Sequence, residues 1–152
     1  MKIYVNGAGE IPDALRAALS LRHALSADPS DCGAWALFCR PGDLSLRLLD
    51  PDRAPALPPV ILALIPYWDS EGEDPALCAY YGSVTGAVRA LGRRGIRANC
   101  LRYSRPEDGN SDSVALCRAP EISEIARAAA YFIEEPGFIA GQTIDVNGGV
   151  IY

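Results

Sequence analysis

Few side chains in this chain could carry out chemistry, and their spacing already excludes several kinds of site. Among its 152 residues are five cysteines and one histidine. The cysteines show no C-x-x-C spacing, and His23 completes no zinc site with them at a familiar spacing. We therefore expect no metal, and reduced, buried thiols at Cys39 and Cys100, which lie in apolar runs. The chain also has a single lysine, Lys2, so a site that tunes a phenol with a lysine ammonium group has one candidate cation.

A glycine-containing turn is the second candidate for chemistry. Residues 6–12 read Asn-Gly-Ala-Gly-Glu-Ile-Pro and follow an apolar segment that we expect to be a strand. Such a turn at the start of a helix can bind the diphosphate of a dinucleotide through backbone N–H groups. Gly7 and Gly9 would permit that approach, whereas Glu10 would place a negative charge beside the phosphates. The alternative, which we favour, is an ordinary strand-to-helix turn that binds no ligand.

These residues are positioned by strands and helices that alternate along the chain. Strands are expected over residues 2–6, 33–39, 44–49, 60–65, 95–101 and 143–146. Helices are expected from Pro12 to near Asp28, from Asp74 to Arg93, and from Pro120 until just before Gly137. The apolar run 60–65, bounded by prolines, is typical of a central parallel strand buried on both faces. The alternation predicts an α/β layered fold with a mostly parallel sheet.

Composition and charge exclude two classes of partner. The net charge of -5 and the pI of 4.8 argue against a nucleic acid, whose phosphates need clustered Lys and Arg. No apolar run reaches the ~18 residues that a membrane-spanning helix needs, so no membrane is expected. The N-terminus reads as a strand and not as a signal peptide, so we expect a cytoplasmic protein. The abundance of Ala, Arg and Leu points to a bacterial source.

Three segments, in this order, carry a family resemblance. Residues 94–99 read Arg-Gly-Ile-Arg-Ala-Asn, residues 121–133 belong to the expected last helix, and residues 141–149 read Gly-Gln-Thr-Ile-Asp-Val-Asn-Gly-Gly. Together they resemble the closing part of the short-chain dehydrogenase/reductase family. The resemblance implies a reduced Rossmann-like three-layer fold, with a mostly parallel sheet of five to six strands, in a single domain over residues 1–152. It also implies NAD or NADP as the cofactor of an active member.

The same resemblance indicates where catalytic residues should stand, and other residues stand there. Family members carry Tyr-x-x-x-Lys at the start of the helix that precedes the Arg-Gly-Ile-Arg segment. The tyrosine gives a proton to the carbonyl substrate, and the lysine lowers the tyrosine pKa and holds the nicotinamide ribose. Counting back from Arg94 with a one-residue gap places Asp74 at the tyrosine position and Cys78 at the lysine position. If Tyr81 is taken as the tyrosine, Thr85 stands at the lysine position, so neither register supplies a lysine.

Other parts of the family pattern are missing as well. The catalytic serine should end the strand 60–65, where the chain reads Leu-Ile-Pro-Tyr, and Ser70 lies only in the following loop. The glycine turn lacks the family's spacing, so Gly7 and Gly9 are a degenerate remnant. The connection from the first to the central strand is also much shorter than in the family. We interpret the chain as a shortened, pseudoenzyme-like member with no catalytic residues and no bound cofactor.

Our leading hypothesis is a non-catalytic subunit that forms a homodimer, or a hetero-oligomer with a full-length, active member of the family. The elements that pair subunits in that family are retained. Small residues recur along one face of the helix from Asp74 to Arg93 and suit a close helix–helix contact across a two-fold axis. The predicted interface consists of Ala79, Gly82, Ser83, Gly86, Ala90, Phe138, Gln142, Ile144 and Val146. Alternatively, the small residues pack against the protein's own sheet.

Two other functions stay open from the sequence. A minimal NAD(P)-dependent carbonyl oxidoreductase would use Tyr67, Tyr80 or Tyr81 as its acid without a lysine. A different small-molecule pocket could lie at the carboxyl ends of the strands, between residues 64–68 and 101–104. Its aromatic walls would be Tyr67, Trp68 and Tyr103, which could equally be plain caps of the core.

Overall fold

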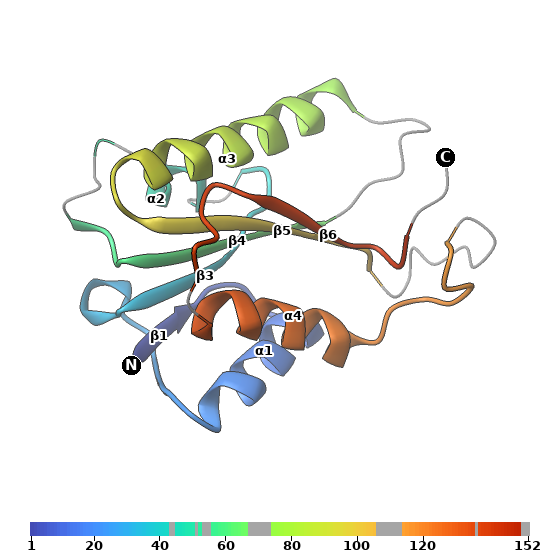
Figure 1. Ribbon diagram of the computed structural model, residues 1–152, viewed down its shortest axis with the longest axis horizontal. Coiled ribbons are helices and arrows are strands. Elements are labelled where there is room, and N and C mark those ends of the chain that lie inside the picture. Colours follow the sequence, from blue (N-terminus) through green and yellow to red (C-terminus); the bar gives the residue numbers. More distant parts are fainter. Residues whose placement is uncertain are drawn as a thin grey trace.

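Six parallel strands form one sheet in the described part of the computed structural model, as Figure 1 shows. The described residues are 1–42, 45–50, 52, 56–66, 74–105, 114–135 and 137–149. The strands are β1 (Lys2–Val5), β2 (Ala24–Ser26), β3 (Ala34–Phe38), β4 (Val60–Pro66), β5 (Arg97–Tyr103) and β6 (Thr143–Val146). Their order in the sheet is β2-β1-β3-β4-β5-β6. The direction of winding reverses at β1, because β2 lies on one side of it and β3 on the other.

The central strand β4 shows why the apolar run 60–65 folds as it does. Leu62 and Leu64 point to one face of the sheet and are 1% exposed, while Ile61 and Ile65 point to the other face and are equally buried. A strand that is covered on both faces needs apolar side chains at successive positions and not only at alternate ones. The prediction of a central parallel strand at this place is confirmed.

Helices cover both faces of the sheet and complete three layers (Figure 1). The helices α1 (Glu10–Ser20) and α4 (Ile122–Glu134) lie side by side on one face. The longer α3 (Pro75–Arg93) covers β4 and β5 on the other face, with the short α2 (Ser45–Leu48) beside it. The predicted three-layer α/β arrangement with a parallel sheet is therefore confirmed.

The starts of α3 and α4 are fixed by their own sequences. Asp74 is the N-cap of α3, where its Oδ1 accepts a hydrogen bond of 2.9 Å from the backbone N–H of Ala76, and Pro75 opens the helix. At α4, the side chains of Glu121 and Glu124 form a reciprocal capping box. Both helix starts agree with the sequence, because each depends on residues that are close together in the chain.

Residues 44–49 do not form the expected strand. The described part of this segment contains α2 instead. Strand β3 pairs directly with β4, so no position is left between them for another strand. The short helix packs near α3, and Leu49 is fully buried there. Leucines at alternate positions over so few residues also fit one helical turn, which is why the sequence was ambiguous.

The first helix is shorter than expected and a strand follows it. It begins at Glu10, two residues before Pro12, and ends at Ser20. The next segment forms β2, which pairs with β1 through the register Lys2 to Ala24. Leu25 continues the apolar spacing of the helix, and a strand of three residues is too short to show alternation of its own. Strand β5 also begins later than expected, because Gly95 first turns the chain with a φ of 82°.

Candidate functional site

The turn between β1 and α1 needs its two glycines for its own geometry. Gly7 and Gly9 have φ angles of 81° and 113°, which side chains with a Cβ rarely adopt. A Cβ on Gly7 would also lie 3.4 Å from the Cβ of Phe38. Asn6 continues the pairing with β3, since its Nδ2 donates to the carbonyl of Phe38 at 3.3 Å and its backbone N–H donates to Ala36 at 3.2 Å. The glycines are thus explained by the turn itself.

The start of α1 does not fit the diphosphate of a dinucleotide. An anion at a helix N-terminus needs free N–H groups and the positive end of the helix dipole. Pro12 removes one N–H from the first turn, and Glu10 and Asp13 place two carboxylates there. Arg16 does not offset them toward a ligand, because its guanidinium pairs with Asp13 and donates to the carbonyls of Val5 and Gly7.

Two cavities lie beside this turn, and the one at the start of α1 has mixed charge and is small. It measures about 180 Å³, and Glu10 lines it together with Arg40, Tyr103 and Arg105. Pockets that hold drug-sized ligands are usually larger, at about 300–1,000 Å³. Tyr103 is 4% exposed and packs edge-on against Phe38 with ring centroids 6.3 Å apart, so it is a part of the core as well as a wall. The cavity at the start of α1 therefore does not accommodate a dinucleotide, whereas a second cavity at the same turn, lined by Asn6, Gly7 and Arg16, measures about 420 Å³.

The start of α3 carries no phenol beside an ammonium group. Asp74 uses its carboxylate as the helix cap, and Cys78 presents an exposed thiol one turn later. Lys2, the only lysine, lies at the beginning of β1, at the opposite end of the strands from the start of α3 (Figure 1). There it pairs with Asp31, and that hydrogen bond raises the pKa of Lys2 above its ordinary value. The cation that acid–base chemistry of this type needs is therefore absent from this described helix start.

The remaining aromatic and nucleophilic candidates are only partly placed. Tyr80 and Tyr81 form an edge-on pair with centroids 5.6 Å apart and pack against the cluster between α3 and the sheet. The candidates Tyr67, Trp68 and Ser70 lie outside the described residues.

The cysteine and metal expectations can be compared with the described residues. Cys39 and Cys100 are each 1% exposed, and burial raises the pKa of Cys100 to about 12. The expectation of buried thiols is confirmed for both of them. No group of three metal-ligating side chains occurs in the described ranges.

The segments that carry the family resemblance contact one another. Arg97 at the start of β5 donates to the carbonyls of Phe132 and Ile133 at 2.7 and 2.8 Å, and so caps the last turn of α4. The buried Asn99 donates to the carbonyl of Ile139 at 2.8 Å and accepts from the backbone N–H of Gln142 at 3.2 Å. These two side chains join β5 to the last helix and to the loop before β6, which gives the Arg-x-Asn pattern a structural role.

The end of α3 approaches the same loop closely. A Cβ on Gly92 would lie 3.7 Å from the backbone nitrogen of Gly141, and a Cβ on Gly141 would lie 3.7 Å from the Cα of Arg89. Gly141 also has a φ of 71° and donates to the carbonyl of Ala98 at 2.7 Å. The helix, β5 and the loop before β6 therefore meet at one place, at the amino ends of the strands.

The small-residue face of α3 points away from the sheet. Val84, Val88 and Leu91 are 0% exposed and form the inner face of the helix. The opposite side carries the predicted interface residues: Ala79, Gly82, Ser83 and Gly86 are exposed and Ala90 is half-buried. A Cβ at Gly82 or Gly86 would meet no atom within 4 Å. Ala79, Gly82, Ser83 and Gly86 therefore do not pack against the protein's own sheet, contrary to that alternative, whereas Ala90 is half-buried.

The predicted interface residues near β6 are presented unequally. Phe138 is 110% exposed, and Gln142 is exposed as well. Ile144 and Val146 are half-buried, and Val146 packs against the cluster under α1 and α4. Among the described strands, β6 lies at the edge of the sheet and pairs with β5. The structure thus places the two predicted groups on separate elements, one on the outer face of α3 and one at the edge of the sheet.

Sequence reasoning missed several arrangements of charged side chains, among them the following three. Arg16 links α1 to the glycine turn, as described above. Arg102 on β5 pairs with Asp145 on β6 through two hydrogen bonds of 2.6 Å. His23 lies 3.1 Å from Glu134, which also pairs with Arg22 at 2.7 Å. Arg102 and Asp145 are 43 residues apart in the chain, and His23 and Glu134 are 111 residues apart, so no local pattern could have identified these two arrangements.

Of the comparisons with known proteins, the one with solved structures found matches, and these agree with the fold. No protein-family model matches the chain, and no curated protein matches it. Among solved structures, the chain is similar to a Brucella melitensis short-chain dehydrogenase/reductase described as a glucose/ribitol dehydrogenase. That alignment has 18% identity and a TM-score of 0.65, and it covers 99% of this chain and 96% of the other.

Two further structures give the same result. A short-chain dehydrogenase family protein from Francisella tularensis has 12% identity and a TM-score of 0.58, with coverage of 97% and 96%. The 3-hydroxyacyl-CoA dehydrogenase type-2 from Mycobacterium avium has 14% identity and a TM-score of 0.59, with coverage of 99% and 95%. The chain has the Rossmann-like fold of short-chain dehydrogenase/reductases, so the resemblance seen in the sequence is confirmed at the level of the fold. Among the described residues, no helix has both the length and the apolar character needed to cross a bilayer.

Proposed function

We propose that this chain is a non-catalytic protein with the fold of short-chain dehydrogenase/reductases that acts as an oligomerisation or partner subunit. Its partner is a second copy of itself or a full-length, active protein of the same fold. In this proposal it binds no nicotinamide cofactor and works in the bacterial cytoplasm. The outer face of α3 is the contact surface, and the exposed Phe138 near the sheet edge is a second one.

The observation that carries the proposal is the pair of glycines in the middle of α3. Each glycine inside a helix costs about 1 kcal/mol relative to alanine. Contacts with the described residues do not require Gly82 and Gly86, because a Cβ at either position would meet none of their atoms within 4 Å. A second helix that packs closely across this face would explain both of them, since only small residues let two helix backbones approach closely.

The charges along α3 favour a partner helix that runs in the opposite direction. Asp74 is exposed at the start of the helix, and Arg89 and Arg93 are exposed near its end. In an antiparallel pair of α3 helices, a two-fold axis between Gly82 and Gly86 places the acidic start of each helix beside the basic end of the other. Such an arrangement is isologous, as in most closed dimers. A partner of the same fold supplies the matching surface.

The chemistry of the chain supports the non-catalytic part of the proposal. Asp74 and Cys78 occupy the positions that the resemblance assigns to the catalytic tyrosine and lysine. The start of α1 carries carboxylates and a proline where a dinucleotide needs N–H donors. The alternative of a minimal NAD(P)-dependent carbonyl oxidoreductase has no observation in its favour.

The test is an association measurement with a matched pair of variants. Ala79→Arg places a bulky cation on the outer face of α3, and Ala17→Arg makes the same change at an exposed position of α1. We expect the wild-type chain to form a dimer by native mass spectrometry, or a complex when co-expressed with a full-length protein of this fold. Ala79→Arg should weaken that association by about tenfold or more, a loss of about 1.4 kcal/mol, while Ala17→Arg leaves it unchanged.

Three outcomes would contradict the proposal. The first is a chain that stays monomeric at high micromolar concentration and captures no protein of this fold. The second is an equal effect of the two arginine variants, which would place the contact elsewhere. The third is a shift of nicotinamide fluorescence on titration with NADH or NADPH, which would show cofactor binding and favour an enzyme.

A further inference from the structure

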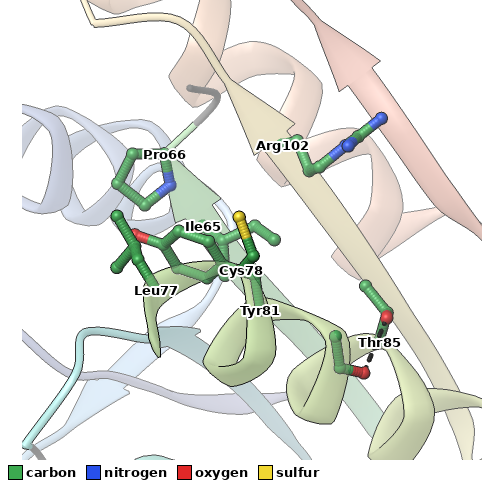
Figure 2. Close-up of a pocket in the computed structure, with 8 residues that line it drawn as sticks. Ile65, Pro66, Leu77, Cys78, Tyr81, Thr85 and Arg102 are labelled. Atoms are coloured by element: carbon green, nitrogen blue, oxygen red, sulfur yellow. Dashed lines mark hydrogen bonds between the residues drawn. The ribbon is translucent and has the colours of Figure 1, made fainter. Parts of the chain in front are cut away.

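A cavity lies between the first turns of α3 and the carboxyl ends of β4 and β5. Its volume is about 260 Å³. The residues that line it are Ile65, Pro66, Leu77, Cys78, Tyr81, Gly82, Thr85 and Arg102. Figure 2 shows these side chains, with the Cys78 sulfur extending from α3 into the space between Pro66 and Arg102. The cavity is separate from the turn between β1 and α1, and no residue lines both.

The polar side chains of Thr85 and Arg102, which line this cavity, are bonded within the chain. The hydroxyl of Thr85 donates to the carbonyl of Gly82 at 3.0 Å. The guanidinium of Arg102 is turned toward β6, where Nε and Nη2 each donate to the carboxylate of Asp145 at 2.6 Å. Figure 2 shows the guanidinium directed away from Cys78, with the methylene stem nearer to the cavity. The positive charge of Arg102 is therefore balanced by a neighbouring carboxylate.

The surface left to face the cavity is mostly hydrocarbon. Ile65 is 1% exposed and contributes a branched chain from the end of β4, and Pro66 and Leu77 contribute a ring and a second branched chain. The ring of Tyr81 and the sulfur of Cys78 complete the lining from α3. Sulfur is polarizable and makes favourable contacts with the edges of aromatic rings. A ligand here would gain apolar contact on several sides.

We infer that this cavity binds a small, uncharged, largely apolar organic molecule, of the size of a bicyclic aromatic ring. An apolar cavity of about 150 Å³ in another protein is dry and binds benzene, so the larger cavity here suits a larger ring. Burying a charged group without a partner costs far more than burying a hydrocarbon, and Arg102, the one charged side chain among the described lining residues, is already paired with Asp145. The cavity therefore selects against carboxylates of the same size.

The experiment uses Cys78 as the reporter and Cys117 as its internal control. Both thiols are exposed, but only Cys78 lines the cavity. The full chain is treated with iodoacetamide, with and without indole, and the alkylation of each cysteine is followed by peptide mass spectrometry. We expect saturating indole to slow the alkylation of Cys78 by at least fivefold and to leave Cys117 unchanged. Indole-2-carboxylate, which adds a charge to nearly the same shape, should protect Cys78 at least tenfold less well at equal concentration.

Two variants make the result specific to the cavity. Cys78→Phe fills the space, and Ala76→Phe adds the same ring at an exposed position of α3 that does not line it. Indole should raise the melting temperature of the wild type and of Ala76→Phe but not that of Cys78→Phe, and circular dichroism checks that both variants fold. Equal protection of Cys78 and Cys117 by indole would overturn the inference, as would equal protection by the carboxylate or an undiminished shift in Cys78→Phe.

Discussion

Replacing Asn99 with alanine should destabilise the fold more than its small size suggests. Asn99 is 1% exposed and its side chain makes two hydrogen bonds, of 2.8 Å to the carbonyl of Ile139 and of 3.2 Å from the N–H of Gln142. Each such bond contributes about 0.5–1.5 kcal/mol net, and a buried partner left unsatisfied costs about 1–3 kcal/mol. The expected loss is about 2–3 kcal/mol in the free energy of unfolding.

The assay is urea unfolding followed by circular dichroism, with hydrogen exchange as a local readout. A loss of this size is a large part of the about 5–15 kcal/mol that stabilises a domain. With a slope of about 1–3 kcal/mol per molar urea, the midpoint should fall by about 1 M or more. The N–H groups of Cys100 and Gly141, which bond to the carbonyls of Gln142 and Ala98, should exchange faster in the variant than in the wild type.

Two further variants make the prediction refutable. Asn147→Ala removes a half-buried asparagine that accepts one hydrogen bond of 3.1 Å from Gly149, and it should cost less than about 1 kcal/mol. Asn99→Asp can still accept from Gln142 but cannot donate to Ile139 and adds a buried charge, so at neutral pH it should be at least as destabilising as Asn99→Ala. If Asn99→Ala costs no more than Asn147→Ala, the structural role given to the Arg-x-Asn pattern is wrong.

Two further predictions follow from α3 and α4. Changing Gly82 and Gly86 together to alanine should raise the free energy of unfolding of the monomer by about 2 kcal/mol, because both positions face open space, and it should weaken self-association. Urea unfolding of dilute protein measures the first effect, and sedimentation measures the second. A destabilised monomer would contradict the first expectation. The hydrogen bonds from Arg118 hold the pKa of Glu124 well below its ordinary value of 4.5, at about 2. A carboxyl group with a lowered pKa stabilises the fold above pH 4.5, and the fold loses that stabilisation as the pH falls toward 2. NMR titration of Glu124 should therefore find a midpoint near 2 in the wild type and a higher midpoint, toward 4.5, in Arg118→Gln. An unchanged midpoint in the variant would refute the assignment.

Much of the sheet could be predicted because its signals are local. The run 60–65 is bounded by prolines, and Asp74-Pro75 opens a helix with a cap and a proline in adjacent positions. Such signals act over a few residues and do not depend on the tertiary contacts around them. Residues 44–49 and Leu25 were misjudged for the opposite reason. The secondary structure of these segments depends on strand pairing, namely β3 with β4 and β1 with β2. A short apolar pattern carries no information on which strands pair.

The candidate site could be predicted only in part. The absence of a lysine beside Asp74 or Cys78 is a fact of the sequence, and it needed no structure. The direction of the small-residue face of α3 could not be decided from the sequence, because small residues suit a contact with the sheet and a contact with a partner equally well. The pair formed by Arg102 and Asp145 joins residues far apart in the chain. That pair depends on the register between β5 and β6, which only the folded chain reveals.

The contacts that hold the fold and the positions that the resemblance assigns to chemistry lie at opposite ends of the sheet. Arg97, Asn99 and Gly141 lie at the amino ends of β5 and β6, where they join these strands to α3 and α4. The residues that would do chemistry, at Gly7 and at Asp74, lie at the carboxyl ends of β1 and β4, where open α/β sheets bind their ligands (Figure 1). Residues at the carboxyl ends of the strands can therefore be substituted while the contacts at the amino ends, which hold α3 and α4, are kept. A sequence resemblance that depends on Arg97, Asn99 and Gly141 therefore predicts the fold. The residues at the positions of Gly7 and Asp74 bear on activity.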